Sequence, residues 1–151
     1  MNAARRLAVG GALLVLVAGL AACAPRDPRA AEEAASAVFD DLVAAAGRVD
    51  TAVLRTLEVD DPSELACARP EGSVQRVYTA RGTLAVEAAD ADASLVVDAV
   101  AARLDPGRWD TIRAPEPRQS AWTDEDGTVA TVTADGPVIA IAVFTPCLAA
   151  G

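Results

Sequence analysis

Hydrophobic residues near the start of the chain form one short, continuous run, from Leu7 to Leu20. Two arginines precede this run, and two alanines follow it, directly before Cys23. A basic start, a short apolar stretch and small residues at a cleavage point are typical of an export signal. The run is shorter than the roughly 20 apolar residues that a membrane-spanning helix needs. We therefore expect residues 1–22 to be a signal peptide that is removed.

Apolar residues then recur at the three- and four-residue steps of an amphipathic helix, from Arg29 to about Leu57. We expect this long helix to pack on the chain's own sheet rather than on a partner helix. Two alternatives stay open at Gly47, because the helix either kinks there or ends there with Asp50 capping a second piece. The predicted apolar stripe consists of Ala31, Ala34, Val38, Leu42, Ala45, Val49, Val53 and Thr56, widened by Phe39, Val43 and Ala46.

The middle of the chain carries strand-type residues. After a loop expected over residues 63–72, β-branched and aromatic residues predict extended structure from Val74 to Ala88. Gly82 suggests a bulge, or a tight turn between two shorter strands. A second helix is predicted from Asp90 or Asp92 to Leu104, where Asp-Pro-Gly stops it. Its predicted apolar face comprises Leu95, Val96, Ala99, Val100 and Leu104.

β-branched runs separated by Asp-Gly turns predict an antiparallel meander in the last third of the chain. Strands are expected over residues 109–113, 119–123, 128–134 and 138–145. Ile139, Ile141 and Val143 would share one face of the last strand, against the helices. The expected fold is α+β: a two-layer sandwich with one or two helices on one face of an antiparallel sheet of about four strands. Threonines in residues 128–134 would then face water.

Length and charge describe the mature domain. Removing residues 1–22 leaves an expected tether at residues 23–29 and a single domain at residues 30–151. Every basic residue is an arginine, and after residue 22 there are eleven of them against twenty-two acids. Such an acidic domain is not expected to bind nucleic acid or an anionic membrane by electrostatics.

Of the three cysteines, Cys23 lies at the expected cleavage point, and Cys67 and Cys147 lie within the expected domain. Exported proteins use cysteines in even numbers for disulfides, and setting Cys23 aside leaves Cys67 and Cys147. In an oxidising compartment we expect these two to form a structural bridge that ties the ends of the sheet region together. A redox role is the alternative, but redox pairs usually sit close together as Cys-X-X-Cys.

The stretch Leu20-Ala21-Ala22-Cys23 resembles the lipobox of bacterial lipoproteins. This resemblance implies that the thiol of Cys23 is acylated and that the signal is cut before it. With Cys67, Trp109 and Thr145-Pro146-Cys147, the chain is also similar to small actinobacterial lipoproteins of unassigned function. That resemblance implies a domain held by lipid at the outer face of the cytoplasmic membrane, and it transfers no activity.

Two residue types that common catalytic sites need are missing from the chain. Without histidine there is no Ser-His-Asp or Cys-His pair and no histidine-based metal site. Without lysine there is no Ser-Lys pair and no Schiff base. We therefore expect no enzyme activity, no metal and no cofactor, and we assign no catalytic residue.

Carboxylates are the remaining candidates for chemistry. A glycosidase needs two of them facing each other across a cleft. The alternative hypothesis is a hydrolase of cell-wall glycan or lipid of this kind, with Glu87 and Asp110 as an example of two acids from distant segments. Asp40-Asp41, Asp60-Asp61 and Asp124-Glu125-Asp126 are expected as a solvated charged surface instead.

Two weaker ligand signals remain. Asp124, Asp126 and Gly127 match part of a calcium loop, but the register puts tryptophan and threonine where the loop needs its first and last acids. Trp109 and Trp122 are candidate ligand contacts because indole rings form stacking platforms, although core anchoring is the interpretation that we favour. The expected function is a non-enzymatic module that binds an envelope protein or a small ligand and reaches the membrane through Cys23.

Overall fold

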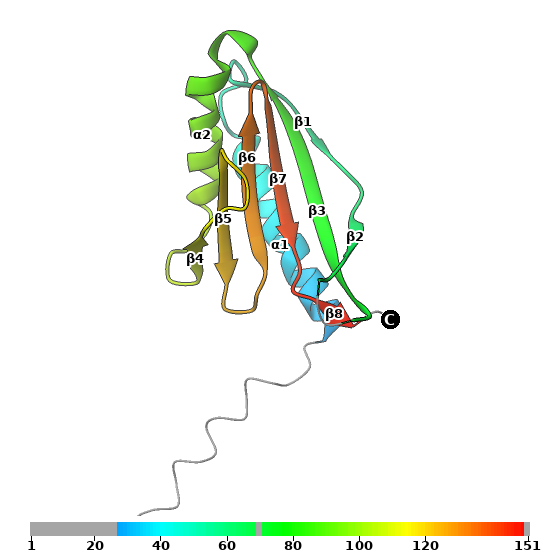
Figure 1. The fold of residues 1–151 in the computed structure, drawn as a ribbon. Helices are drawn as coiled ribbons and strands as arrows, with labels where there is room; N and C mark the ends of the chain where they lie inside the picture. The colour runs from blue at the N-terminus through cyan, green and yellow to red at the C-terminus, as the bar shows by residue number, and fades with distance from the viewer. Residues whose placement is uncertain (1–26, 69–70, 150–151) are drawn as a thin grey trace, which may run out of the picture.

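The computed structural model describes residues 27–68 and 71–149. In this part of the chain, two helices lie on the same side of an antiparallel sheet (Figure 1). The α+β class is therefore confirmed, but the sheet has eight strands rather than about four. The expected signal peptide and Cys23 lie outside the described residues, so the expectations about them stay predictions. Neither described helix is long and apolar enough to cross a membrane.

The long strand β3 organises one half of the sheet. The strand order is β1-β3-β7-β6-β5-β4, and β2 and β8 also pair with β3. Every pairing between neighbouring strands is antiparallel. The elements are α1 (Pro28–Ala46), β1 (Leu54–Val59), β2 (Ser63–Ala66), β3 (Ser73–Leu84), the 3-10 helix η2 (Val86–Ala88), α2 (Ala89–Ala101), β4 (Trp109–Ile112), β5 (Gln119–Asp124), β6 (Val129–Asp135), β7 (Val138–Phe144) and β8 (Leu148–Ala149).

Helix α1 ends at Ala46 with Gly47 as its C-cap, so of the two alternatives at Gly47 the end is right and the kink is wrong, and no helix continues to Leu57. Asp50 holds a turn there, because its side chain accepts a hydrogen bond from the amide two residues further on, at 2.8 Å. The chain then enters β1, in which Leu54 pairs with Leu84 of β3. Strand pairing overrides the helical spacing of the apolar residues here, since local propensity is a weak preference beside tertiary contacts.

Strand β3 runs through Gly82 without a break, so of the two alternatives there the tight turn between two shorter strands is wrong. Gly82 lies inside it, and a Cβ at this position would sit 2.7 Å from Leu54 Cδ1 and 2.8 Å from Ile139 Cγ1. The glycine therefore lets two core side chains close over the strand. The irregularity in register falls on the neighbouring strand β1, between Leu54 and Thr56. The loop expected over residues 63–72 also contains a strand, β2.

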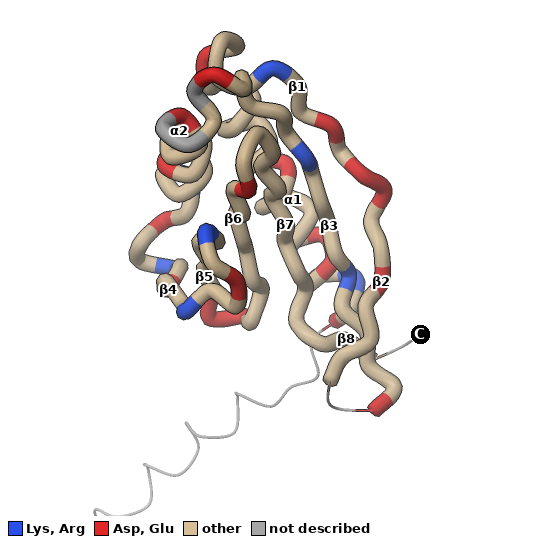
Figure 2. Tube along the Cα trace, turned by 45° about the horizontal axis from the view of Figure 1, so that its top comes forward, with Lys and Arg blue, Asp and Glu red and all other residues tan. Residues whose placement is uncertain are grey.

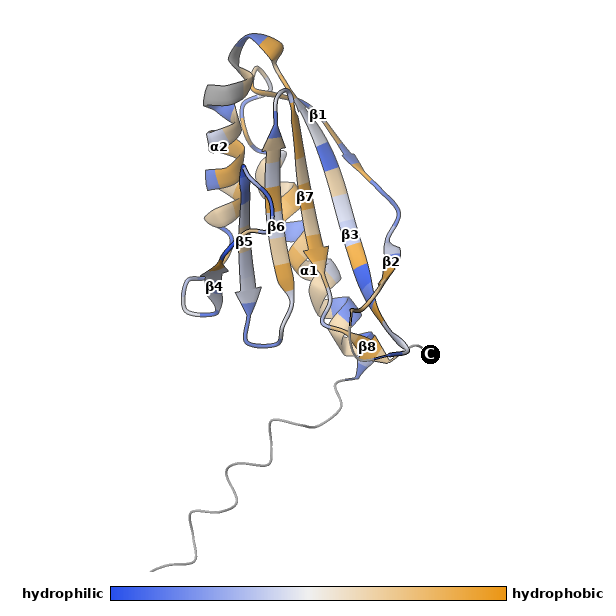
Figure 3. Ribbon diagram, viewed as in Figure 1, coloured by the Kyte–Doolittle hydropathy of each residue, from blue (hydrophilic) through white to orange (hydrophobic). Residues whose placement is uncertain are grey.

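The hydrophobic core fills the space between the helices and one face of the sheet, and hydrophobic residues run along the central strand β7 (Figure 3). Ile139, Ile141 and Val143 are fully buried, which confirms their predicted face. Burial of side chains of this size stabilises a fold by roughly 1.5–3 kcal/mol each. Leu95 of α2 departs from the predicted apolar face, because it is 48% exposed.

The opposite face of the sheet is not covered by either described helix. Thr131 and Thr133 alternate with the core residue Val132 and therefore lie on this open face. Thr131 is nevertheless buried and Thr133 half-buried, so the expectation that these threonines face water is only partly right. Strands lie about 5 Å apart, and side chains on neighbouring strands cover a small residue in the middle of a sheet.

Candidate functional site

The start of α1, the β5–β6 turn and β8 lie together at one end of the domain (Figure 1). We call this the tether end, because the expected tether joins the domain there. The described chain begins with Asp27, whose side chain caps α1 by accepting a hydrogen bond from the Arg29 amide at 3.1 Å. Helix α1 starts at Pro28, one residue before the expected end of the tether.

Asp124 organises the β5–β6 turn at this end. Its side chain is only 1% exposed. One carboxylate oxygen, Oδ1, accepts hydrogen bonds from the amides of Asp126 at 3.0 Å and Thr128 at 2.8 Å. The other oxygen, Oδ2, accepts from Arg108 Nη2 at 3.3 Å. The expectation that Asp124 belongs to a solvated surface is therefore wrong, although an aspartate that opens a turn often binds the amide two residues on.

Arg108 reaches Asp124 from the loop that follows α2. Asp105 shapes this loop, because its side chain accepts a hydrogen bond from the Gly107 amide at 2.9 Å and its carbonyl accepts from the amides of Arg108 and Trp109. Trp109 then pairs with Asp124 in the β4–β5 ladder, which brings its neighbour Arg108 alongside the carboxylate. The sequence pattern did not single out Arg108, since only the strand register creates this contact.

Two cavities adjoin Arg108. The first, of about 220 Å³, lies between the start of α1 and the β5–β6 turn. The second, of about 210 Å³, lies farther along α1, near the end of α2. We call the two together the α1 groove, since Arg108 lines both of them. The first is lined by Asp27, Ala30, Ala31, Ala34, Arg108, Asp124, Asp126, Thr128 and Pro146, and the second by Val38, Asp41, Leu42, Arg103, Leu104, Asp105, Arg108 and Trp109.

The α1 groove exists because α1 carries more apolar surface than the core covers. The predicted stripe included Ala31, Ala34 and Val38, but the structure leaves Ala34 exposed and the other two half-buried. It buries Ala35, which the predicted stripe did not include, and Phe39, which the prediction placed at the widened edge of the stripe. The helix is thus turned about its axis relative to the prediction, and one edge of its apolar stripe faces the groove. The short alanine side chains leave the first cavity unfilled.

The two tryptophans belong to the core, as the favoured interpretation has it. Trp109 is 7% exposed, and Trp122 is half-buried and packs against the same cluster. Trp109 also lines the second cavity of the α1 groove, whereas Trp122 lines neither cavity. Of the two candidate ligand contacts, the structure therefore brings only Trp109 to the groove.

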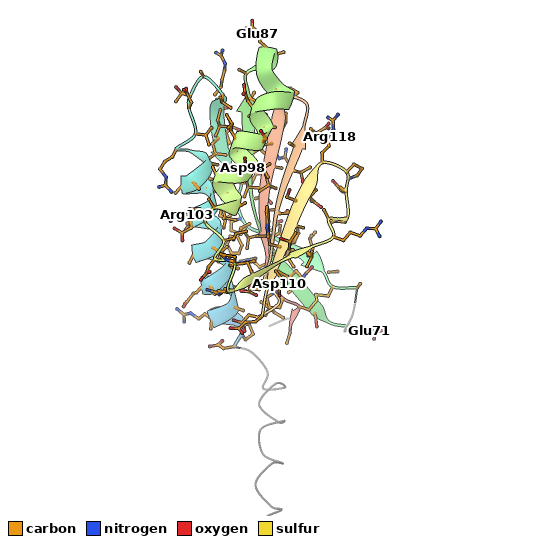
Figure 4. All side chains as sticks on the ribbon, turned by 90° about the vertical axis from the view of Figure 1, so that its left-hand side faces the viewer. Glu71, Glu87, Asp98, Arg103, Asp110 and Arg118 are labelled. Atoms are coloured by element: carbon orange, nitrogen blue, oxygen red, sulfur yellow. A yellow bond between two sulfur atoms is a disulfide. The ribbon has the colours of Figure 1, made fainter. Side chains whose placement is uncertain are left out.

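The carboxylates named for a hydrolase are not brought together. Glu87 and Asp110 lie toward opposite ends of the domain (Figure 4), so this pair cannot flank one glycosidic bond. Asp40, Asp41, Asp60 and Asp61 are exposed, as expected for solvated charges, and the last two belong to an acidic edge beside β1 and β2 (Figure 2). Among the described residues, no cluster of three or more acidic, cysteine or histidine side chains is placed to hold a metal ion.

The predicted disulfide is confirmed. Cys67 and Cys147 are bonded, with their Cα atoms 6.1 Å apart and 80 positions between them in the sequence. Nearby, fully buried Thr145 accepts a hydrogen bond from the Arg76 amide on Oγ1 at 2.9 Å, and its carbonyl accepts from Gln75 Nε2 at 3.0 Å. The Thr-Pro-Cys segment, which directly follows β7, is thereby bonded to β3.

Tyr78 links β3 to α1 on the other flank of the helix. Its hydroxyl donates a hydrogen bond to the carbonyl of Glu32 at 3.2 Å, and its ring lies 5.9 Å from that of Phe39 between centroids. Burial raises the pKa of Tyr78 above its ordinary value of 10.0, and the negative charge of Glu32 raises this pKa further. The phenol therefore stays protonated and holds the helix against the sheet.

Comparison of the chain with protein-family models, curated proteins and solved structures finds no match in any of the three. A function must therefore be argued from the residues of this chain and their arrangement.

Proposed function

We propose that this chain is a cell-envelope lipoprotein. In this proposal, lipid on Cys23 holds the domain at the outer face of the cytoplasmic membrane, where it binds an envelope protein or a small ligand without catalysing a reaction. One observation carries the proposal: the lipobox-like stretch Leu20-Ala21-Ala22-Cys23 is followed directly by a domain whose first helix begins at Pro28. The lipid would therefore hold the tether end close to the bilayer.

Three features of the chain support an exported protein that is not an enzyme. The Cys67–Cys147 bridge suits an oxidising compartment outside the cytoplasm. The buried carboxylate of Asp124 uses both of its oxygens to hold a turn and an arginine, which leaves it a structural role. The chain also lacks the histidine and lysine that most acid–base and nucleophilic sites use.

Metabolic labelling with an alkyne-bearing fatty acid tests the anchor. The wild-type protein is expected to take up the label, and the Cys23→Ser variant is expected to take up none, because the acylated thiol is gone. The matched control is Cys67→Ser, which removes a thiol of the disulfide and is expected to keep the label. An unlabelled wild-type protein, or a labelled Cys23→Ser variant, would overturn the proposal.

A further inference from the structure

We propose that the open face of the sheet, which lies opposite the two helices, binds a second copy of this chain about a two-fold axis that runs along the strands. In this dimer, β7 of one copy faces β7 of the other. Acidic residues beside β1 of each copy face the basic connection between β4 and β5 of its partner. The orientation of the copies rests on the proposed function, since lipid on Cys23 would hold both tether ends at one membrane.

Strand β7 carries hydrophobic side chains on both of its faces. Its core residues alternate with residues on the open face, because successive side chains of a strand point to opposite sides. A strand with one face in water normally alternates between apolar and polar residues, whereas a strand covered on both faces is apolar throughout. The sequence of β7 therefore indicates that a further surface covers it. Its open-face residues are Val138, which is 43% exposed, Ala140, Ala142 and Phe144.

The centre of the open face carries no charge. Residues 129–134 of β6 and the whole of β7 contain no acidic or basic residue. After residue 22 the chain has twenty-two acids against eleven arginines, so two copies repel each other overall. A two-fold axis places a patch against the same patch of the partner, so like charges on the axis would meet. An uncharged centre is therefore the part of this acidic domain that suits a second copy.

An unpaired acid borders this centre on the side of β1. Glu58 of β1 points to the open face, because its neighbour Leu57 packs against the core. Arg81, which lies opposite Glu58 on β3, forms an ion pair with Asp60 at 3.6 Å. Glu58 forms no ion pair with another described residue. Its carboxylate is therefore free to face a positive charge on a partner.

Basic residues border the centre on the side of β5. The connection between β4 and β5, residues 113–118, contains Arg113, Arg118 and one acid, Glu116. Figure 4 shows this connection and Arg118 on the side of the sheet opposite α1. Arg118 approaches Asp135 to 4.0 Å, whereas Arg113 forms no ion pair with another described residue. The connection thus supplies positive charge beside the open face.

The strand register places these opposite charges at the same level. β1 lies two strands from β7 in one direction, and β5 lies two strands from it in the other. Arg113 leaves the sheet after the pair Ile112–Ala121, within two rows of Gln119. A two-fold axis along β7 therefore turns Arg113 of each copy toward Glu58 of its partner. The ladder pairs that form one row across the sheet link Glu58, Arg81, Ala140, Thr133 and Gln119.

The same axis suits two copies on one membrane. Rotation about an axis along the strands leaves both tether ends at the same end of the dimer, where the lipid on each Cys23 would enter one bilayer. The strands of two sheets packed face to face run within about 30° of each other, and the sheets lie about 10 Å apart. The proposed arrangement is therefore an ordinary aligned sandwich of two sheets.

Cross-linking of the full, lipidated chain in its native membrane tests the dimer. The substitution Val138→Cys places a thiol on the open face of β7, whereas Cys67 and Cys147 are bonded to each other. A short bis-maleimide is expected to join two such chains, because facing sheets lie about 10 Å apart. Ala37→Cys is the matched control, an exposed position on α1 that is expected to give monomer only. Thr83→Cys, opposite Val138 on β3, replaces Val138→Cys if thermal unfolding shows that this variant does not fold.

Charge exchange tests how the two copies are oriented. In the Val138→Cys chain, Glu58→Arg and Arg113→Glu are each expected to lower the cross-linked fraction several-fold, because like charges then face each other twice. The two substitutions in one chain exchange the charges and are expected to restore the dimer. Glu58→Arg also reduces the net negative charge, so a general charge effect would raise the cross-linked fraction instead. Both positions are exposed, and thermal unfolding checks that the variants fold.

Each outcome decides a different claim. If Val138→Cys gives no more dimer than Ala37→Cys, the dimer is overturned, and a chain that still takes up the fatty-acid label leaves the anchor standing. A chain without the label overturns the anchor, whatever the cross-linking gives. Cross-linking to a protein of another mass in place of the dimer overturns the assigned partner. Single charge reversals without effect, or a double variant that does not restore the dimer, overturn the proposed orientation.

Discussion

Different interactions stabilise the two ends of the domain (Figure 1). At the tether end, contacts join residues far apart in the sequence, including the Cys67–Cys147 bridge and the ion pair between Arg108 and Asp124. The distal end, where the β6–β7 turn and the start of α2 lie, has a local turn at Gly136 and leaves Val86 80% exposed. This end depends on close packing instead, as the crowded position of Gly82 shows.

Both ends leave a cavity: about 220 Å³ between the start of α1 and the β5–β6 turn, and about 350 Å³ beside the start of α2 and Gly136. At the tether end, a disulfide and a buried carboxylate fix the strands and turns around the cavity. At the distal end, the strands are held where Leu54 and Ile139 close over Gly82. Substitutions at the two ends should accordingly destabilise the domain by different mechanisms.

Loss of the disulfide should give the largest effect. The substitutions Cys67→Ser and Cys147→Ser together remove a cross-link that closes a loop of 80 positions. In the chain-entropy model such a bridge stabilises the folded state by about 4–5 kcal/mol, and often by less in practice. Urea unfolding of oxidised wild type and the double variant measures the difference. If neither substitution nor reduction changes the midpoint, long-range ties do not hold the tether end.

The substitution Gly82→Val should give the second-largest effect. It is expected to lower the free energy of unfolding by about 3 kcal/mol, because the added side chain overpacks the core. Its first carbon atom would meet Leu54 Cδ1 at 2.7 Å and Ile139 Cγ1 at 2.8 Å, and both neighbours belong to the core. Gly47→Ala is the control, because the closest atom to its Cβ is 3.4 Å away. Thermal unfolding compares the two variants, and equal midpoints would show that the distal end is not tightly packed.

The substitution Asp124→Ala should lower the free energy of unfolding by about 2 kcal/mol, because it leaves buried amides without their acceptor. The amides of Asp126 and Thr128 both lose a hydrogen bond to Oδ1. Asp110→Ala is the control, an exposed aspartate on the adjoining strand β4. Amide hydrogen exchange at Thr128 reports the effect locally. Unchanged protection in Asp124→Ala would mean that the carboxylate does not hold the turn.

The smallest effect concerns Tyr78 at high pH. The pKa of this group is raised in the folded state, so the native protein keeps the phenol proton where the unfolded chain has lost it. The free energy of unfolding should therefore be unaffected by this group below pH 10.0 and should fall as the pH rises above that value. The substitution Tyr78→Phe removes the part of this decrease in the free energy of unfolding that comes from the phenol. Phenolate absorbance follows the titration of the single tyrosine.

The sequence predicted the C-terminal meander well, because Asp-Gly turns and β-branched runs are local signals. Turns at Gly127 and Gly136 have the positive φ that glycine allows, and they lie where the pattern put them. The N-terminal half was harder, since helical spacing continues into residues that form β1. Their pairing with β3 depends on residues between 21 and 30 positions away, from Val59–Ala80 to Leu54–Leu84, which no local pattern encodes.

The candidate site was predictable only in part. The cysteine pair followed from counting, but Arg108 became visible only through the strand register beside Asp124. The α1 groove depends on how α1 is rotated, and periodicity alone did not separate the covered edge of the stripe, at Phe39, from the open edge at Ala34. Rotation is set by packing against the sheet rather than by the helix itself.

Intact-mass measurement of the native protein, extracted from membranes, tests the central claim most directly. The account predicts one mature species that begins at Cys23 and carries the additional mass of acyl groups there, with the two remaining cysteines oxidised. A mature chain that begins at another residue, or one with an unmodified thiol at Cys23, would contradict it.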